Sequence, residues 1–252
     1  MSLFRNTAFF KSAAELAHLP ASTREIAFAG RSNAGKSSAI NALAGRRIAF
    51  VSKTPGRTRL INFYALGPER FVVDLPGYGY AKLPQAMRAP WEKLLGAYLR
   101  KRAPLRGLTV VMDVRHPLTE LDRRLLEWFR PTGKPVHILL TKADKLSRAA
   151  AKKVLRRVEG EIAALGPNIS VQLFSSLKNS GLEEAAAVLG TWLDASAPAP
   201  CSAGDENPRH DQGSRNKNPR AIRGISPGQN ALRFKAPRSG RRSGRRPKSP
   251  KA

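Results

Sequence analysis

The sequence lacks the residues that disulfide frameworks and zinc sites require. Its 252 residues include one cysteine, Cys201, and four histidines that lie far apart, at positions 18, 116, 137 and 210. One cysteine cannot form an intramolecular disulfide, and scattered histidines cannot supply the closely spaced ligands of a structural zinc site. The composition therefore favours a reducing compartment and excludes a fold that depends on disulfides or zinc.

Long apolar runs are also absent from the sequence. No run approaches the ~18 consecutive apolar residues that a membrane-spanning helix needs, although 41% of the residues are apolar and can form a core. The first twenty residues lack the long apolar stretch and the small-residue cleavage site of a secretory signal. We therefore expect a cytoplasmic protein that does not insert into a membrane.

Acidic residues are scarce relative to basic ones. The chain has 18 acidic and 45 basic residues, a formal net charge of +27, and 14 of the basic but only 3 of the acidic residues lie in residues 198–252. This charge favours binding to a polyanion, and nucleic acid is the most abundant polyanion in a cytoplasm. A general role in solubility is the alternative. We find no basic amphipathic helix that would favour a membrane surface.

Composition divides the chain into three parts. Residues 23–196 are predicted to form the main domain, and residues 1–22 an N-terminal extension that packs on it. Residues 197–252 are rich in Pro, Gly, Ser and Arg and contain few large apolar residues. Because such a segment cannot bury enough apolar surface to offset its ordering entropy, we expect it to be disordered.

In the main domain, strand patterns alternate with helical patterns. The predicted strands are Glu25–Gly30, Leu60–Leu66, Arg70–Asp74, Leu108–Asp113, Val136–Thr141 and Ser170–Ser175. The predicted helices are Lys36–Ala44, Pro84–Lys101, Glu120–Phe129, Arg148–Leu165 and Leu182–Asp194. This alternation indicates an α/β three-layer sandwich with helices on both faces of a mostly parallel six-stranded sheet. The short turn at Gly67-Pro68 leaves no room for a crossover, so one strand should be antiparallel.

The stretch "GRSNAGKS" fits the phosphate-binding pattern G-x-x-x-x-G-K-[ST], with Gly30, Gly35, Lys36 and Ser37 in register. It follows a predicted strand and opens a predicted helix, as this motif requires. Its backbone N–H groups and the helix N-terminus would surround a β-phosphate. Lys36 would reach the β- and γ-phosphates and the Ser37 hydroxyl would bind Mg²⁺, so we predict a P-loop NTPase fold.

Two further motifs favour GTP over ATP. "DLPG" fits D-x-x-G, in which Asp74 would hold Mg²⁺ through water and the Gly77 N–H would sense the γ-phosphate. "TKAD" ends another strand, and the Asp144 carboxylate can accept both N1–H and N2–H₂ of guanine. Adenine has no donor at either position and would leave this carboxylate unpaired. In "FSSLK" a serine backbone N–H would contact the guanine O6.

These motifs, together with "SKTPGRT", "DLPGYGYA" and "MDVRHPL", resemble the translation-factor-related P-loop GTPases and, more closely, the EngB family (also called YihA or YsxC). The resemblance covers about residues 5–195. It implies a bacterial GTPase that binds the large ribosomal subunit or its rRNA precursor late in assembly, with a link to cell division and septation. The arginine-rich tail after residue 196 is not part of the family pattern, which leaves the binding surface open.

The resemblance also implies a set of site residues. Lys36, Thr58, Gly77 and Asn33 would be catalytic, while Ser37, Thr58 and Asp74 would hold Mg²⁺. The nucleotide-binding residues would be Gly30, Arg31, Ser32, Asn33, Ala34, Gly35, Lys36, Ser37, Gly56, Arg57, Thr58, Arg59, Leu60, Asp74, Leu75, Pro76, Gly77, Thr141, Lys142, Ala143, Asp144, Phe174, Ser175 and Ser176. Thr58 follows a Pro-Gly-Arg arm that could swing it onto Mg²⁺, and Thr54 is the alternative.

The residue after D-x-x-G is Tyr78, where Ras-like enzymes carry a glutamine that positions the attacking water. Unassisted hydrolysis should therefore be slow. Several P-loop GTPases that lack this glutamine use an asparagine in the P-loop to help coordinate K⁺, and Asn33 holds that position. Stabilisation of the loop by an Asn33 hydrogen bond is the alternative.

Asp113, Arg115, His116 and Asp122 form a polar group that resembles a catalytic cluster. We favour structural roles at the strand-to-helix junction over a conformational relay or a ribosome contact. Basic pairs that could contact phosphates are Arg46-Arg47, Lys101-Arg102 and Arg123-Arg124.

The leading hypothesis is a monomeric, GTP-hydrolysing assembly factor of the large ribosomal subunit. One alternative is an RNA-binding protein that uses GTP as a structural ligand, and another is a GTPase of the division apparatus.

Overall fold

A seven-stranded sheet forms the centre of the molecule in the computed structural model, which describes residues 3–49, 60–78 and 94–194. The strands are β1 (Ala8–Ala13), β2 (Arg24–Gly30), β3 (Ile61–Gly67), β4 (Arg70–Asp74), β5 (Leu105–Asp113), β6 (Val136–Thr141) and β7 (Ile169–Leu173). The helices are α1 (Lys36–Ala44), α3 (Glu120–Phe129), α4 (Arg148–Ala163) and α5 (Leu182–Asp194), and residues 94–101 are also helical. Short 3-10 turns complete the described elements at Leu3–Asn6, Leu16–His18, Arg130–Thr132 and Ala143–Lys145.

The sheet order is β1-β3-β4-β2-β5-β6-β7. Strands β4, β2, β5, β6 and β7 pair in parallel, and β3 is antiparallel to both β1 and β4. The predicted fold class is therefore confirmed, including the antiparallel strand at the Gly67-Pro68 turn. All parallel strands have their carboxyl ends at the same edge of the sheet, which we call the carboxyl edge.

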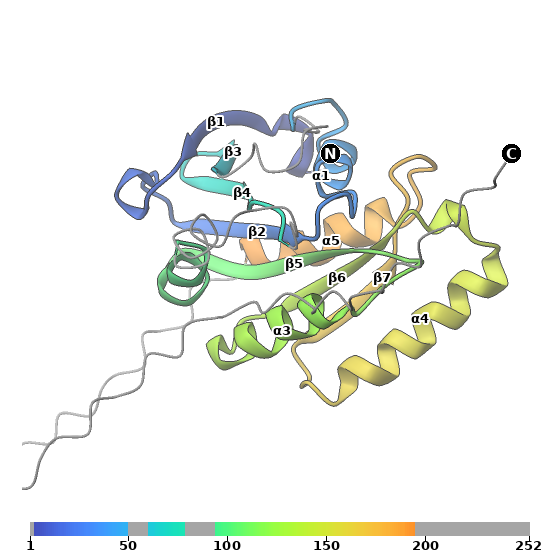
Figure 1. The fold of residues 1–252 in the computed structure, drawn as a ribbon. Helices are drawn as coiled ribbons and strands as arrows, with labels where there is room; N and C mark the ends of the chain where they lie inside the picture. The colour runs from blue at the N-terminus through green and yellow to red at the C-terminus, as the bar shows by residue number, and fades with distance from the viewer. Residues whose placement is uncertain (1–2, 50–59, 79–93, 195–252) are drawn as a thin grey trace, which may run out of the picture.

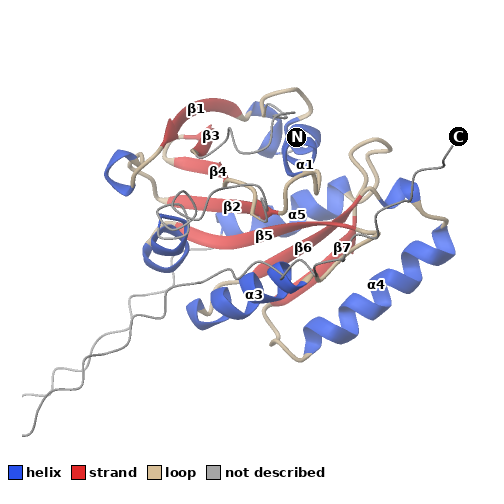
Figure 2. Cartoon of the chain, in the orientation of Figure 1, coloured by secondary structure: helices blue, strands red, loops and turns tan. Residues whose placement is uncertain are grey.

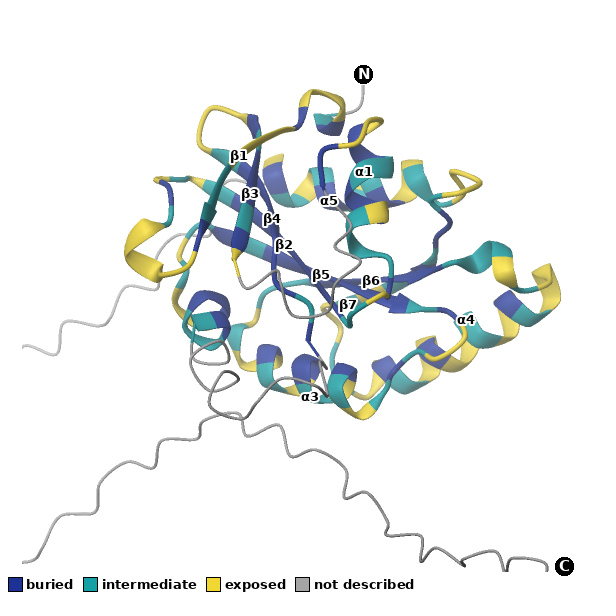
Figure 3. Cartoon of the chain, turned by 45° about the horizontal axis from the view of Figure 1, so that its top comes forward, coloured by how far each residue is buried: buried dark blue, intermediate teal, exposed yellow. Residues whose placement is uncertain are grey.

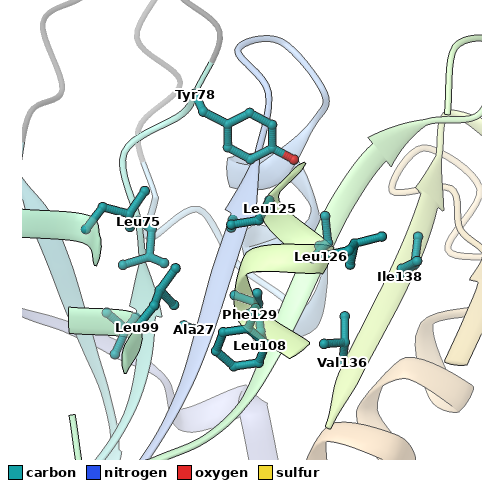
Figure 4. Packing of buried hydrophobic residues seen from close by; sticks show 14 of the residues in the cluster. Ala27, Leu75, Tyr78, Leu99, Leu108, Leu125, Leu126, Phe129, Val136 and Ile138 are labelled. Atoms are coloured by element: carbon teal, nitrogen blue, oxygen red, sulfur yellow. The ribbon is translucent and has the colours of Figure 1, made fainter. Parts of the chain in front are cut away.

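Helices cover both faces of the sheet (Figure 1). One core cluster joins residues 94–101, α3 and α4 to the sheet, and the other joins α1 and α5 to the opposite face. Figure 4 shows part of the first cluster, in which Leu126 and Phe129 of α3 lie near Leu108 of β5 and Ile138 of β6. Strand β5 contributes to both clusters, with Leu108 on one side and Val111 on the other, as expected for a strand buried on both faces.

Strand β1 is a correction to the predicted six-stranded sheet. It pairs with β3, and a register shift lies between Phe9 and Lys11. Phe9 packs against Tyr64 while Phe10 packs against Phe71, although both phenylalanines remain more than half exposed. A bulge of this kind breaks the two-residue alternation by which strands are recognised, so the sequence pattern gave no strand here.

The boundaries of the described elements differ from the predictions by up to three residues, and the predicted start of the helix Pro84–Lys101 lies outside the described residues. Strand β5 begins at Leu105, whereas the prediction began at Leu108. The prediction followed the apolar run, and Arg106 and Gly107 at the start of the strand do not belong to that run. Strand β7 ends at Leu173, and the next segment turns back so that Ser175 N donates to Ser180 O at 3.0 Å. None of the described helices has the length and apolar character needed to cross a bilayer.

Candidate functional site

The predicted motifs meet at the carboxyl edge of the sheet. The P-loop follows β2, the D-x-x-G segment begins at the end of β4, and the "TKAD" and "FSSLK" segments follow β6 and β7. Figure 2 shows these strand ends as neighbours along one edge. Ligands of open α/β sheets bind outside this edge, so the topology alone brings together four motifs that span about 145 residues of sequence.

The P-loop has the backbone that its glycines permit. A Cβ at Gly30 would lie 2.7 Å from the Val111 carbonyl oxygen, so a side chain cannot fit there. Gly35 has a φ of 99° and is the residue before α1, and Asn33 also has a positive φ, of 63°. Helix α1 then begins at Lys36, which directs its free N–H groups and the positive end of its dipole toward the loop.

Lys36 and Asp74 join the first two motifs. The Lys36 ammonium forms an ion pair with the Asp74 carboxylate, and these side chains are only 12% and 6% exposed. A nearly buried lysine and carboxylate that lie side by side at a helix N-terminus can interact with an anion and with a cation, respectively. Ser37 is the second residue of α1 and lies half-buried beside Lys36.

Backbone hydrogen bonds hold the D-x-x-G segment against the P-loop. Ser32 N donates to Tyr78 O, and Tyr78 N donates to Gly30 O, both at 3.2 Å. A Cβ at Gly77 would lie 3.4 Å from Ser32 N, so the backbone of this segment lies directly against the P-loop. The end of β4 and the P-loop therefore form one connected structure.

Tyr78 points into the core and not toward the P-loop. It is 2% exposed, and its hydroxyl donates to Asp122 Oδ1 at 2.7 Å. Figure 4 shows its ring next to Leu125 of α3. Burial and then the nearby Asp122 raise the pKa of Tyr78 well above its usual value, so the hydroxyl is a neutral donor. This side chain cannot replace the water-positioning glutamine.

Asp122 has a structural role that its position in α3 explains. Its Oδ2 accepts hydrogen bonds from Thr119 N at 2.9 Å and from Thr119 Oγ1 at 2.7 Å, which completes a capping box at the N-terminus of α3. Because its other oxygen accepts from Tyr78, Asp122 connects the cap of α3 to the D-x-x-G segment.

The "TKAD" segment contacts the other side of the P-loop. Thr141 Oγ1 donates to the Ala34 carbonyl at 2.5 Å, and Lys142 Nζ donates to the Asn33 carbonyl at 2.7 Å. Lys142 has a φ of 59°, and its ammonium also lies 3.0 Å from Asp113 Oδ2. These contacts fix the Lys142 side chain beside the P-loop. A planar base could pack along the aliphatic part of this side chain.

Asp144 is held as a charged acceptor. Ser175 Oγ donates to Asp144 Oδ1 at 2.6 Å, and this hydrogen bond keeps the pKa of the Asp144 carboxyl below its usual value. Backbone contact between the two loops runs from Ala143 N to Phe174 O at 3.1 Å. Since Ser175 N already donates to Ser180 O, the serine N–H available for a ligand is that of Ser176.

The polar group after β5 does not converge on one point. Asp113 accepts from the Arg115 side chain at 2.9 and 2.6 Å and contacts Lys142, and these partners hold the pKa of Asp113 well below its usual range. His116 is exposed, and Asp122 belongs to the capping box. Asp113 therefore positions Lys142, a role that the sequence did not reveal because the two residues are 29 positions apart.

Some predicted site residues lie outside the described part of the chain, namely Gly56, Arg57, Thr58 and Arg59, as does the alternative Thr54. Leu60, at the end of that segment, is 39% exposed. The structure describes the remaining predicted residues, and all of them belong to the four motifs at the carboxyl edge.

Comparison with known proteins identifies close relatives. Residues 25–142 match the family model of the 50S ribosome-binding GTPases. The chain is 60% identical over 198 residues to the probable GTP-binding protein EngB of Dechloromonas aromatica, covering 77% of this chain and 90% of the relative. It is 56% identical over 210 residues to the protein of the same name from Neisseria meningitidis serogroup B, covering 82% of this chain and all of the relative.

Solved structures show the same fold at lower identity. A crystal structure of a probable GTP-binding protein engB has a TM-score of 0.55 and 20% identity, covering 68% of this chain and 98% of that one. Era in complex with MgGDPNP and a fragment of 16S ribosomal RNA has a TM-score of 0.54 and 20% identity, covering 72% of this chain and 60% of Era. At this level of identity the two structures support the architecture of the sheet and helices.

Proposed function

This chain belongs to the EngB family of GTP-binding proteins and is a GTPase, and on that premise we propose that it is a Mg²⁺-dependent switch that acts in assembly of the large ribosomal subunit. The observation that carries the proposed nucleotide site is the contact between Lys36 and Asp74 at the N-terminus of α1. This contact joins the P-loop to the D-x-x-G motif.

The phosphates would lie over the P-loop and the N-terminus of α1. Backbone N–H groups of Gly30–Ser37 would surround the β-phosphate, and Lys36 would turn from Asp74 to the β- and γ-phosphates. Gly77 N–H would bond a γ-phosphate oxygen. Water attacks the γ-phosphorus, the bond from that phosphorus to the β–γ bridging oxygen breaks, and the products are GDP and inorganic phosphate.

The residues present fit Mg²⁺. Ser37 and Thr58 would bind it directly and Asp74 through water, and all three supply the oxygen donors that this ion prefers. Within the described residues no cluster of three or more His, Cys, Asp or Glu could hold a metal alone, which suits an ion bound jointly with phosphates. Bound there, Mg²⁺ would neutralise charge on the β- and γ-oxygens.

Guanine selection is proposed for Asp144, with Lys142 along the base and Ser176 N–H at O6. The test is Asp144→Asn. A side-chain amide offers one acceptor and one donor, which match N1–H and O2 of xanthine, whereas guanine presents donors at both positions. We expect GTP affinity to fall about 10- to 100-fold and affinity for xanthosine triphosphate to rise. Unchanged GTP affinity would contradict this role.

Hydrolysis should be slow without help, since Tyr78 is buried and bonded to Asp122. We propose that Asn33 assists by holding K⁺ beside the phosphates. Asn33 is exposed, and its side chain makes no hydrogen bond within the described residues, so these residues offer no partner for the alternative of a loop-stabilising hydrogen bond. Hydrolysis should be faster in K⁺ than in Na⁺, and Asn33→Ala should remove the difference. Equal rates in both salts would exclude K⁺ assistance.

The proposed partner is the large ribosomal subunit or its rRNA, which gives a cytoplasmic site of action. The net charge of +27 and the description of the matching family support this proposal. GTP would order two switch segments, Gly56–Leu60 and Asp74–Gly77, and so favour binding. Hydrolysis would release the protein, which we propose acts as a monomer. A link to cell division would then be a consequence of ribosome supply.

The decisive experiment is sedimentation of the protein with purified large ribosomal subunits in GDP and in a non-hydrolysable GTP analogue. A form truncated after residue 196 serves as the control for the basic tail. Binding with the analogue alone supports the switch. Equal binding in both states favours a constitutive RNA-binding protein, and absence of binding in both redirects the search to the division apparatus.

A further inference from the structure

Helix α4 carries an unbroken row of basic side chains on its solvent side. Its buried residues are Ala151, Val158 and Ile162, and the last two belong to the core cluster that covers one face of the sheet. The opposite side exposes four cations, Arg148, Lys152, Lys153 and Arg156, which we call the α4 basic face. Figure 3 shows exposed residues along this side of the helix. Helix α4 is thus a basic amphipathic helix, which was not expected from the sequence.

The cations of the α4 basic face have no partners among the described residues. No hydrogen bond or ion pair involves them, and acidic residues appear on the helix only from Glu159 onward. The next cation, Arg157, lies 3.8 Å from Glu161. Arg148, Lys152 and Arg156 follow each other at four-residue spacing, at which like charges repel and destabilise a helix. The row therefore gains no stabilisation from an intramolecular partner among the described residues.

The basic pairs named from the sequence are different. Arg102 donates to the buried Glu25 carboxylate, Arg123 forms an ion pair with Glu161, and Arg46 donates to the Thr7 carbonyl at 2.9 Å. Each of these arginines is held by an intramolecular partner, whereas the cations of the α4 basic face have none in the part of the chain that the structure describes. The α4 basic face is therefore a better candidate for binding a polyanion than the basic pairs named from the sequence.

We infer that the α4 basic face binds the phosphate backbone of large-subunit ribosomal RNA. Three cations one helical turn apart span about 12 Å, which suits a repeating row of phosphates better than a single anion. A lipid surface is disfavoured, because the exposed large apolar side chains of the described residues are Phe9, Phe10, Leu16, Leu60 and Leu177, and α4 has none. The inference rests on the proposed ribosomal role.

The position of α4 also predicts how its contribution depends on nucleotide. The helix begins four residues after Asp144 and follows the base-binding segment, not the D-x-x-G segment. Its cations are fixed on a regular helix packed on β7. Phosphate contacts from this face should therefore add the same affinity in the GDP and GTP states, while the switch segments supply the difference between states.

The test compares two full-length variants of equal charge. In the first, Arg148, Lys152 and Arg156 are all replaced by Gln. In the control, Lys11, Lys101 and Arg130 are replaced by Gln, because these cations lie on other elements and have no partner in the described part of the chain. Thermal unfolding and GTP hydrolysis without ribosomes should match the wild type for both variants, since none of these residues belongs to the nucleotide site.

Binding to purified large subunits is measured across a salt series in GDP and in a GTP analogue. For the α4 variant we expect affinity to fall about tenfold or more in both nucleotide states. The slope of log K against log salt should decrease by about two to three, and the control should change little. Equal loss in both variants, or no loss in the α4 variant while the wild type binds, would overturn the inference.

The same variants are then measured on deproteinised large-subunit RNA. Loss of affinity by the α4 variant there supports an RNA contact. Normal binding to this RNA together with weak binding to whole subunits would identify a ribosomal protein as the partner and overturn the inference. Equal binding of the wild type in GDP and in the GTP analogue would contradict only the proposed switch. Failure of the proposed function can therefore be distinguished from failure of the inference about α4.

Discussion

Two buried tyrosines at opposite edges of the sheet make the same hydrogen bond in different surroundings. Tyr98 donates to Glu25 Oε2 at the amino end of β2, and Tyr78 donates to Asp122 Oδ1 at the carboxyl edge, both at 2.7 Å. For each tyrosine, burial and then the carboxylate raise the pKa of the phenol well above its usual value. In both pairs a neutral phenol therefore donates to a buried carboxyl group.

The partners of the two carboxylates differ. Arg102 donates to Glu25 at 2.6 Å and also to the Pro20 carbonyl. The amino ends of the parallel strands, which we call the amino edge, are therefore held by a charge-balanced network of hydrogen bonds. Asp122 receives its remaining hydrogen bonds from Thr119, and no cation lies within ion-pair distance among the described residues. One pair therefore braces the fold, whereas the other joins α3 to the D-x-x-G segment, which we propose responds to nucleotide.

Glu25→Ala should have the largest effect on stability and thereby test the bracing role. The substitution leaves Arg102 and Tyr98 without their acceptor in a buried site, and we expect the free energy of unfolding to fall by about 3–5 kcal/mol. Denaturant unfolding measures the loss. The rate of GTP hydrolysis per folded molecule should stay at the wild-type value. A clear decrease would show that the network around Glu25 also contributes to the nucleotide site.

Asp122→Ala should be less destabilising but should also affect hydrolysis. It removes a charged acceptor from Tyr78, worth about 1.5–3 kcal/mol, and the capping interaction at Thr119. The expected loss of unfolding free energy is about 2–4 kcal/mol. Because the D-x-x-G segment loses its connection to α3, kcat should also fall. A normal kcat in the folded variant would show that Asp122 serves only as a helix cap.

Tyr78→Phe and Tyr98→Phe form the sharpest matched pair. Each removes one hydroxyl and one hydrogen bond to a buried carboxylate, so each should reduce the unfolding free energy by about 1.5 kcal/mol. Tyr78→Phe should also change kcat, whereas Tyr98→Phe should not. Parallel measurements of unfolding and of GTP hydrolysis check this, and equal kcat values for both variants would remove the functional distinction between the edges.

His137 gives the smallest expected effect, a pH dependence of stability. Its ring lies 2.7 Å from Ser170 Oγ and 2.8 Å from Gln172 Oε1, and Gln172 Nε2 reaches the Gly181 carbonyl near the base-binding loop. Burial lowers the pKa of His137 below its usual 6.5, although the hydrogen bond with Gln172 and then the charge of Glu184 oppose this. The unfolded chain therefore takes up the proton first as the pH falls.

Stability contributed by neutral His137 should thus be complete above about pH 6.5 and decline as the pH falls below it, by at most about 1.4 kcal/mol per pH unit. Denaturant unfolding between pH 5 and 7.5 measures the slope. His137→Asn should flatten the dependence in this window. An unchanged slope would assign it to other groups.

Much of the fold could be predicted because its signals are local. The apolar runs at Val136–Thr141 and Arg70–Asp74 gave strands with the observed bounds, as did the helices Lys36–Ala44 and Glu120–Phe129. The bulge at Phe9 and Phe10 concealed β1. Clusters of basic residues in sequence were also misleading, since a pair such as Arg123-Arg124 says nothing about the acidic residues that fold against it.

The sequence by itself determined the family, the order of the motifs and the chemistry that each motif can perform, because these depend on residue type at short spacing. Only the tertiary structure decided which side chains meet. It paired Lys36 with Asp74, Asp113 with Lys142, and Tyr78 with Asp122. It also left the cations of the α4 basic face without partners among the described residues. Such pairings join residues tens of positions apart, and the parallel sheet brings them together because its strands end at a common edge.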